Sequence, residues 1–101
     1  MVVNHVVIMS LRRAASDVEQ TVLVNACRTM AGRIGTVKSL ECGFDLGLSG
    51  EKAQKFSLIA KFDTMEDYLT YSKHPLHIEF VETHVKPILA EGGRHAIQYE
   101  I

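Results

Sequence analysis

The chain has 101 residues, of which 47% are hydrophobic, and this fits one compact domain over residues 1–101 without room for a second. Its 11 basic and 12 acidic side chains are scattered and give a formal charge of −1, which excludes a basic stripe for nucleic acid or a charged tail for a membrane surface. The apolar runs are far shorter than a membrane span, and residues 1–5 lack the pattern of a signal peptide, so we expect a cytoplasmic protein.

Two further consequences follow from size and cysteine content. A domain of this length buries only about 65% of the surface of its unfolded chain, so closing a sheet against a second copy is a plausible source of extra stability. Cys27 and Cys42 lie in different predicted elements and form no C-x-x-C pair. We therefore expect free, buried thiols and no disulfide framework.

The first third of the chain predicts a strand, a turn and a helix. Residues Val2 to Leu11 are β-branched and apolar, which indicates a strand buried on both faces. After a turn, Ser16 and Glu19 have the spacing of a capping box that begins a helix, and Gly35 ends it. The apolar stripe of this helix consists of Val18, Val22, Leu23, Ala26, Cys27, Met30 and Ile34.

The middle of the chain predicts two strands. Polar and apolar residues alternate from Val37 to Leu46, residues 48–53 form a polar loop, and Lys55 to Phe62 form a third strand. Thr64 is then a good N-cap for a second helical region. Pro75 interrupts this region because proline lacks a backbone donor and disfavours helical geometry at the residue before it.

The remainder predicts a restarted helix and a last strand. A proline suits the first turn of a helix, so we expect a helix from Pro75 to Leu89, closed by Pro87 and Gly92-Gly93. Residues Arg94 to Ile101 form the final strand. The order β-α-β-β-α-β, with its second helix broken at Pro75, predicts an α+β, ferredoxin-like fold. In that fold both helices lie on one face of a four-stranded antiparallel sheet.

Five histidines are the main candidates for chemistry, and their grouping separates them. His74-x-x-His77, with His84 two turns later, resembles a metal-ligand spacing. Pro75 breaks the helix between the first two, and neither a His-Glu-x-x-His pattern nor a cysteine cluster is present, so we expect no metal and no cofactor.

Tyr71, His77 and His5 form the second grouping. Tyr71 and His77 flank the helix break, where both side chains can point into one space between helices and sheet. A phenol and a neutral imidazole form a proton-transfer couple, and His5, a polar residue in an apolar strand, needs a partner. The alternative is that these residues only line the core and hold the helix break in shape.

These segments resemble the stress-responsive A/B barrel (Dabb) family. The resemblance rests on His5-Val6-Val7, on the strand Phe56 to Phe62 with Asp63-Thr64-Met65-Glu66-Asp67-Tyr68 after it, and on Tyr71-x-x-His74-Pro75-x-His77. It implies a dimeric α/β barrel in which the sheets of two copies pack together, helped by the C-terminal strand. In polyketide cyclases of the family, residues that match Tyr71 and His77 form the acid–base couple, and a match of His5 supports them.

The resemblance leaves function open. A plant polyketide cyclase of the family has a histidine and a tyrosine in its cavity where this chain has Phe56 and Cys27. The resemblance therefore implies a pocket that is less polar at those two points. One reading is a homodimer that binds a small apolar carbonyl compound and uses His5, Tyr71 and His77 in cofactor-free catalysis. The second is a non-catalytic stress-related structural or binding protein, and the third is a monooxygenase-like relative of the same fold.

Overall fold

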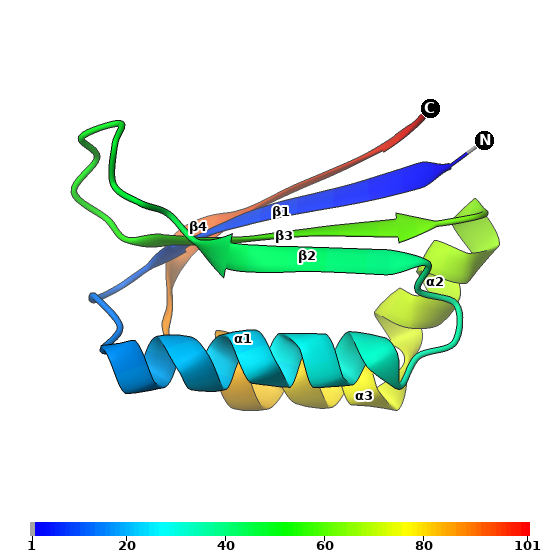
Figure 1. The fold of residues 1–101 in the computed structure, drawn as a ribbon, viewed down its shortest axis with the longest axis horizontal. Coiled ribbons are helices and arrows are strands. Elements are labelled where there is room, and N and C mark those ends of the chain that lie inside the picture. The colour runs from blue at the N-terminus through cyan, green and yellow to red at the C-terminus, as the bar shows by residue number, and fades with distance from the viewer. Residues whose placement is uncertain (1) are drawn as a thin grey trace.

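The computed structural model of the protein describes residues 2–101. The elements are β1 (Val3–Leu11), α1 (Asp17–Gly32), β2 (Ser39–Phe44), β3 (Lys55–Phe62), α2 (Met65–Lys73), α3 (Pro75–Phe80), the π-helical segment η1 (Val81–Val85) and β4 (Leu89–Glu100). Figure 1 shows the helices together on one side of the sheet and the two chain ends side by side. The predicted ferredoxin-like arrangement is confirmed.

The sheet is antiparallel throughout, with strand order β2-β3-β1-β4. β1 is central, and its His5 lies opposite Ala60 of β3 and Gln98 of β4. Because successive side chains of a strand point to opposite faces, the odd-numbered residues of β1 face the helices and the even-numbered ones face outward. His5 therefore points into the layer between sheet and helices.

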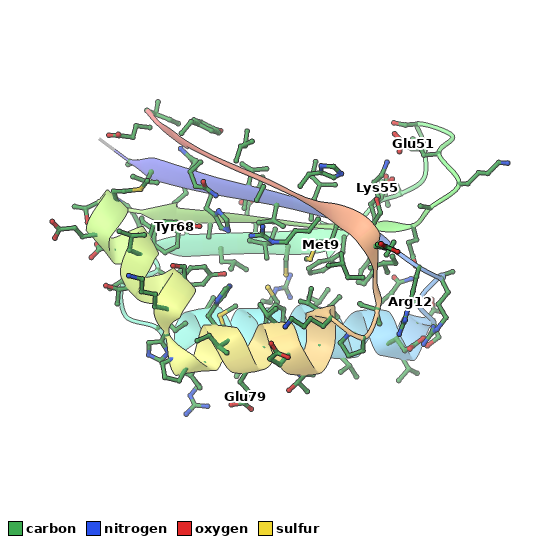
Figure 2. The ribbon with its side chains drawn as sticks, turned by 180° about the vertical axis from the view of Figure 1, so that it is seen from behind. Met9, Arg12, Glu51, Lys55, Tyr68 and Glu79 are labelled. Carbon is green, nitrogen blue, oxygen red and sulfur yellow. The ribbon has the colours of Figure 1, made fainter. Side chains whose placement is uncertain are left out.

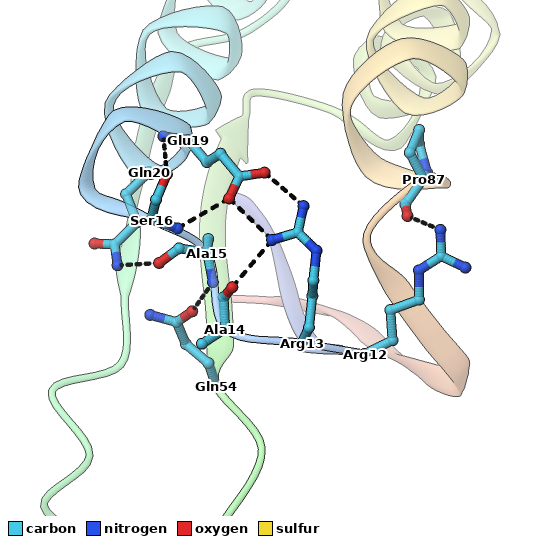
Figure 3. A network of polar contacts seen from close by, with 9 residues as sticks. All are labelled: Arg12, Arg13, Ala14, Ala15, Ser16, Glu19, Gln20, Gln54 and Pro87. Atoms are coloured by element: carbon cyan, nitrogen blue, oxygen red, sulfur yellow. Dashed lines mark hydrogen bonds and ion pairs between the residues drawn. The ribbon is translucent and has the colours of Figure 1, made fainter.

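The N-terminus of α1 carries the expected capping box (Figure 3). The amide of Glu19 donates to Ser16 Oγ at 3.2 Å, and the amide of Ser16 donates to Glu19 Oε1 at 3.0 Å. Arg13 also binds the Glu19 carboxylate, at 2.7 Å. The same region is tied to distant segments, because the amide of Ala15 donates to Gln54 Oε1 at 2.6 Å.

The end of α1 differs from expectation. The helix ends at Gly32, and the amides of Arg33 and Ile34 donate to the carbonyls of Met30 and Ala31 in tighter, three-residue turns. The expected end at Gly35 was wrong because Gly32, with its high backbone entropy, is the weaker point of the helix.

The region after Pro75 also needs a correction. The expected continuous helix to Leu89 is instead the short α3 followed by η1, and Leu89 already pairs with Leu11 as the first residue of β4. Gly92 and Gly93 therefore lie inside β4 and do not close a helix. The sequence suggested a helix end because two adjacent glycines weaken a regular strand. A β-bulge is a common place for glycine within a strand.

The core fills the space between sheet and helices. Figure 2 shows Tyr68 and Met9 within this layer, whereas Glu79 points away from it. The buried apolar core consists of Val3, Val7, Met9, Leu23, Cys27, Met30, Ile34, Phe56, Leu58, Ala60, Phe62, Tyr71, Phe80 and Val85. Both cysteines are free; Cys27 is buried as expected, whereas Cys42 is only partly buried. None of the helices within residues 2–101 is long and apolar enough to cross a membrane, and the cytoplasmic location stays a prediction.

The outward face of the sheet carries apolar side chains with no cover in a single copy. Ile8 on β1 and Ile97 and Tyr99 on β4 are exposed, and Ile97 keeps 61% of its surface accessible. The expected burial of β1 on both faces is therefore met only in part within one chain: on this side Asn4 is buried, whereas Ile8 is 43% exposed.

Candidate functional site

The helix is interrupted at His74-Pro75, where α2 ends and α3 begins. His74 has extended backbone angles, φ −65° and ψ 137°, and Pro75 is the first residue of α3. The amide of Leu76 donates to His74 Nδ1 at 3.0 Å, so the His74 ring caps α3. The predicted break is confirmed, and His74 serves as the N-cap of the helix that follows it.

The same break places His77. In an unbroken helix the Leu76 amide would bond to the carbonyl of Ser72, four residues earlier. Here that amide binds His74, and His77 Nδ1 donates to the freed Ser72 carbonyl at 3.1 Å. A donating Nδ1 leaves Nε2 with its lone pair in the neutral ring. Burial lowers the pKa of His77, so the ring is neutral at pH 7.

Tyr71 packs against His77, with ring centroids 4.5 Å apart. The residue is 1% exposed and lies 5.2 Å from the ring of Phe62. Burial raises the pKa of Tyr71 above its usual range, so the hydroxyl keeps its proton and remains a donor. The Tyr71 hydroxyl makes no hydrogen bond within residues 2–101. It is not among the fully enclosed polar atoms that lack a partner, which in these residues are Asn4 Nδ2 and Thr36 Oγ1.

His5 completes the cluster from β1. It is 3% exposed, and its ring centroid is 4.9 Å from Tyr68 and 6.2 Å from Tyr71. Gln98 Nε2 donates to His5 Nδ1 at 2.8 Å, which places the His5 proton on Nε2. Burial, with the positive charge of Arg94 second, lowers the pKa of His5 to about 4. The expectation that His5 needs a partner is confirmed.

The structure thus brings the three predicted residues into one aromatic cluster, and it adds two that the sequence did not single out. Tyr68 lies between His5 and Phe62, and Gln98 sets the protonation of His5. Tyr68 and Tyr71 are three residues apart in the predicted helix, so the sequence indicates that they share a helix face. The position of Gln98 could not be predicted in this way, because it depends on the register between β4 and β1.

The cluster has donor and acceptor groups, and His5 and Tyr71 are almost fully buried in one copy. Five hollows are described within residues 2–101, and other residues line all of them. The one that lies in the core beside Phe56 and Met9 has no room for a water molecule. No group of three or more His, Cys, Asp or Glu suited to a metal ion occurs in the described part of the chain.

The fold and the cluster together describe a ferredoxin-like α+β protein with histidine and tyrosine side chains between its sheet and its helices. The Stress Responsive A/B Barrel Domain family, Dabb, matches residues 3–101, so the chain belongs to that family. No curated protein matches it in sequence.

Several solved structures share the fold. A dimeric ferredoxin-like protein of unknown function from Thermobifida fusca is 23% identical, with a TM-score of 0.85, and the match covers 100% of this chain and 92% of that one. A Dabb family protein from Mesorhizobium loti is 20% identical, with a TM-score of 0.80 and coverage of 99% and 96%. A hydroxynitrile lyase from Passiflora edulis is 18% identical, with a TM-score of 0.80 and coverage of 99% and 93%.

Proposed function

We propose that this protein is a homodimer that binds a small, mostly apolar carbonyl compound and moves a proton on it without a cofactor. One observation carries the proposal. The rings of Tyr71 and His77 are 4.5 Å apart, and the Ser72 carbonyl holds His77 so that Nε2 keeps its lone pair. A neutral base beside a protonated phenol is the combination that removes a proton next to a carbonyl.

The roles follow from the protonation states. His77 Nε2 takes the proton of the substrate, and the electron pair left behind moves onto the carbonyl oxygen. Tyr71 donates a hydrogen bond to that oxygen as its negative charge develops. His5, protonated on Nε2 by its bond with Gln98, supplies a second donor. The proton then returns from His77 to the product.

The test uses a fluorogenic β-hydroxyketone. In its retro-aldol cleavage the base removes the hydroxyl proton, the bond between the hydroxyl-bearing carbon and the α-carbon breaks, and the electron pair of that bond forms an enolate at the ketone, which then takes the proton back. The enolate oxygen needs the same hydrogen-bond donor as in the proposed reaction. We expect the wild type to cleave the β-hydroxyketone above the buffer rate. Glutamine in place of His77 keeps a donor for the Ser72 carbonyl but lacks the base, so His77→Gln should lower the rate about 10²-fold or more. Tyr71→Phe should lower it as well, and the double exchange Tyr71→Phe, His77→Ala should abolish it.

His84→Gln is the matched control, because it removes an imidazole that packs on Phe80 away from the cluster. It should leave the rate unchanged. A wild type no faster than buffer, or a double variant as fast as the wild type, contradicts the catalytic assignment.

A second candidate is a non-catalytic, stress-related structural or binding protein, and the hollows favour it. A ligand site usually needs about 300 Å³ or more, whereas His5, Tyr71 and His77 line none of the five hollows described within residues 2–101. On this view the histidines hold the helix break and the sheet in place. His77→Gln would then lower stability while the wild type shows no turnover.

Both candidates include a dimer, and the exposed apolar face of the sheet supports it. We expect the wild type to sediment at twice 11.3 kDa at micromolar concentration. An aspartate at Ile97 places a charge among the exposed apolar side chains of this face, so Ile97→Asp should yield the monomer mass. Leu48→Asp, at an exposed loop residue, is the control and should stay dimeric. A wild type that sediments at 11.3 kDa contradicts the dimer.

A further inference from the structure

The helix layer leaves β4 largely uncovered on the side that faces the cluster. The main packing contacts of the helices are made with β1, β2 and β3, whereas β4 packs mainly on its neighbour β1. β4 is also the edge strand. Side chains of β4 that point to the helix side, such as Arg94 and Gln98, are therefore exposed although they lie on the same face as His5.

A bulge in β4 determines which side chains point there. Leu11 pairs with Leu89 and Met9 pairs with Arg94, so two steps along β1 correspond to five along β4. Gly92 has a φ of 66°, and a Cβ on Gly93 would come within 2.7 Å of the Ser10 carbonyl oxygen. Both glycines are required by this geometry. Beyond the bulge the pairing is regular, with Arg94 opposite Met9 and Gln98 opposite His5.

Arg94 lies on the same face of the sheet as His5, in the register that places it opposite Met9. Gln98, four residues further along the same face, is bonded to His5. Arg94 makes no ion pair or side-chain hydrogen bond with any of residues 2–101. Burial and, after it, the positive charge of Arg94 lower the pKa of both His5 and His77. Two neutral imidazoles, a protonated phenol and an unpaired guanidinium give the site a net positive charge.

We propose that Arg94 binds a negatively charged group of the ligand, so that the site takes a small carbonyl compound carrying a carboxylate. This inference rests on the proposed ligand-binding function and specifies its substrate class. A guanidinium forms paired, charge-assisted hydrogen bonds with a carboxylate. Because Arg94 lies on an uncovered edge strand, the charged end of the ligand can remain near water while the apolar part contacts the aromatic cluster.

The test compares two ligands of the same shape, hexanoate and hexanamide. Binding to the dimer is followed by NMR through the ring signals of Tyr71 and His77, at low salt and at pH 7. We expect hexanoate to bind about tenfold more tightly than hexanamide, because only the carboxylate gains the charge-assisted bonds. Added salt should reduce this preference. Arg94→Gln should remove it while leaving the affinity for hexanamide unchanged.

Arg28→Gln is the matched control, since Arg28 is an exposed arginine on α1, which packs on β2. It should keep the preference. Equal binding of the two ligands by the wild type, or a preference that survives Arg94→Gln, overturns the role of Arg94 and leaves the proposed function standing. If neither ligand moves the ring signals, the proposed ligand site falls together with this inference.

Discussion

Replacing Phe56 by alanine is expected to lower the free energy of unfolding by about 3–5 kcal/mol. Phe56 is 0% exposed, and its ring lies 4.9 Å from that of Phe44 on the neighbouring strand. Truncation removes the transfer free energy of the ring and leaves a void, since Met9 on β1 and the facing helices are held by their own packing. The adjoining hollow, which now has no room for water, should enlarge.

Urea unfolding followed by circular dichroism measures this effect, at one fixed protein concentration because a dimer is stabilised by mass action. Leu48→Ala is the control, because Leu48 is 87% exposed in the loop between β2 and β3. It should change stability by no more than about 0.5 kcal/mol. A loss below about 1 kcal/mol for Phe56→Ala would mean that the ring does not fill the core as described.

The protein is also expected to lose stability in mild acid through His5. The pKa of His5 is about 4 in the fold, against 6.5 for the free side chain, chiefly because the ring is buried. Between these values the unfolded chain binds a proton that the folded chain does not, so stability is complete above about pH 6.5 and falls as the pH drops toward 4. The full shift corresponds to roughly 3 kcal/mol, and screening at the open β4 edge reduces the expected loss to about 2 kcal/mol.

Unfolding free energies measured from about pH 7.5 to about pH 4.5 check this prediction. His77, whose pKa is lowered in the same direction, adds to the slope. His5→Gln should flatten most of the pH dependence, because glutamine has no proton to gain, whereas His84→Gln should preserve it. If His5→Gln retains the wild-type slope, other groups control the acid response.

Local interactions explain why much of the fold was predictable. Ser16 and Glu19 form their capping box with backbone groups three residues away, and Thr64 caps α2 in the same way. Pro75 breaks the helix through its own ring and its missing donor. Such features involve neighbours in the chain, so the residue types and their spacing suffice to predict them.

Features that depend on distant contacts were predicted less well. The sequence placed Gly92-Gly93 at a helix end, because nothing local shows that Leu89 pairs with Leu11 and that the strand accommodates both glycines in a bulge. The role of Gln98 was invisible for the same reason. A register error of one residue would move its side chain to the opposite face of the sheet, and only long-range pairing determines that register.

The residue types and their spacing were therefore enough to predict the order of the elements, the helix break and the residues worth testing, His5, Tyr71 and His77. How these residues are arranged depends on contacts between distant segments: the Ser72 carbonyl left free by the break holds His77, Gln98 holds His5, and Tyr71 packs between them. Local spacing determines backbone conformation, whereas protonation and ring contacts depend on groups brought together only by the packing of β1, β4 and the broken helix.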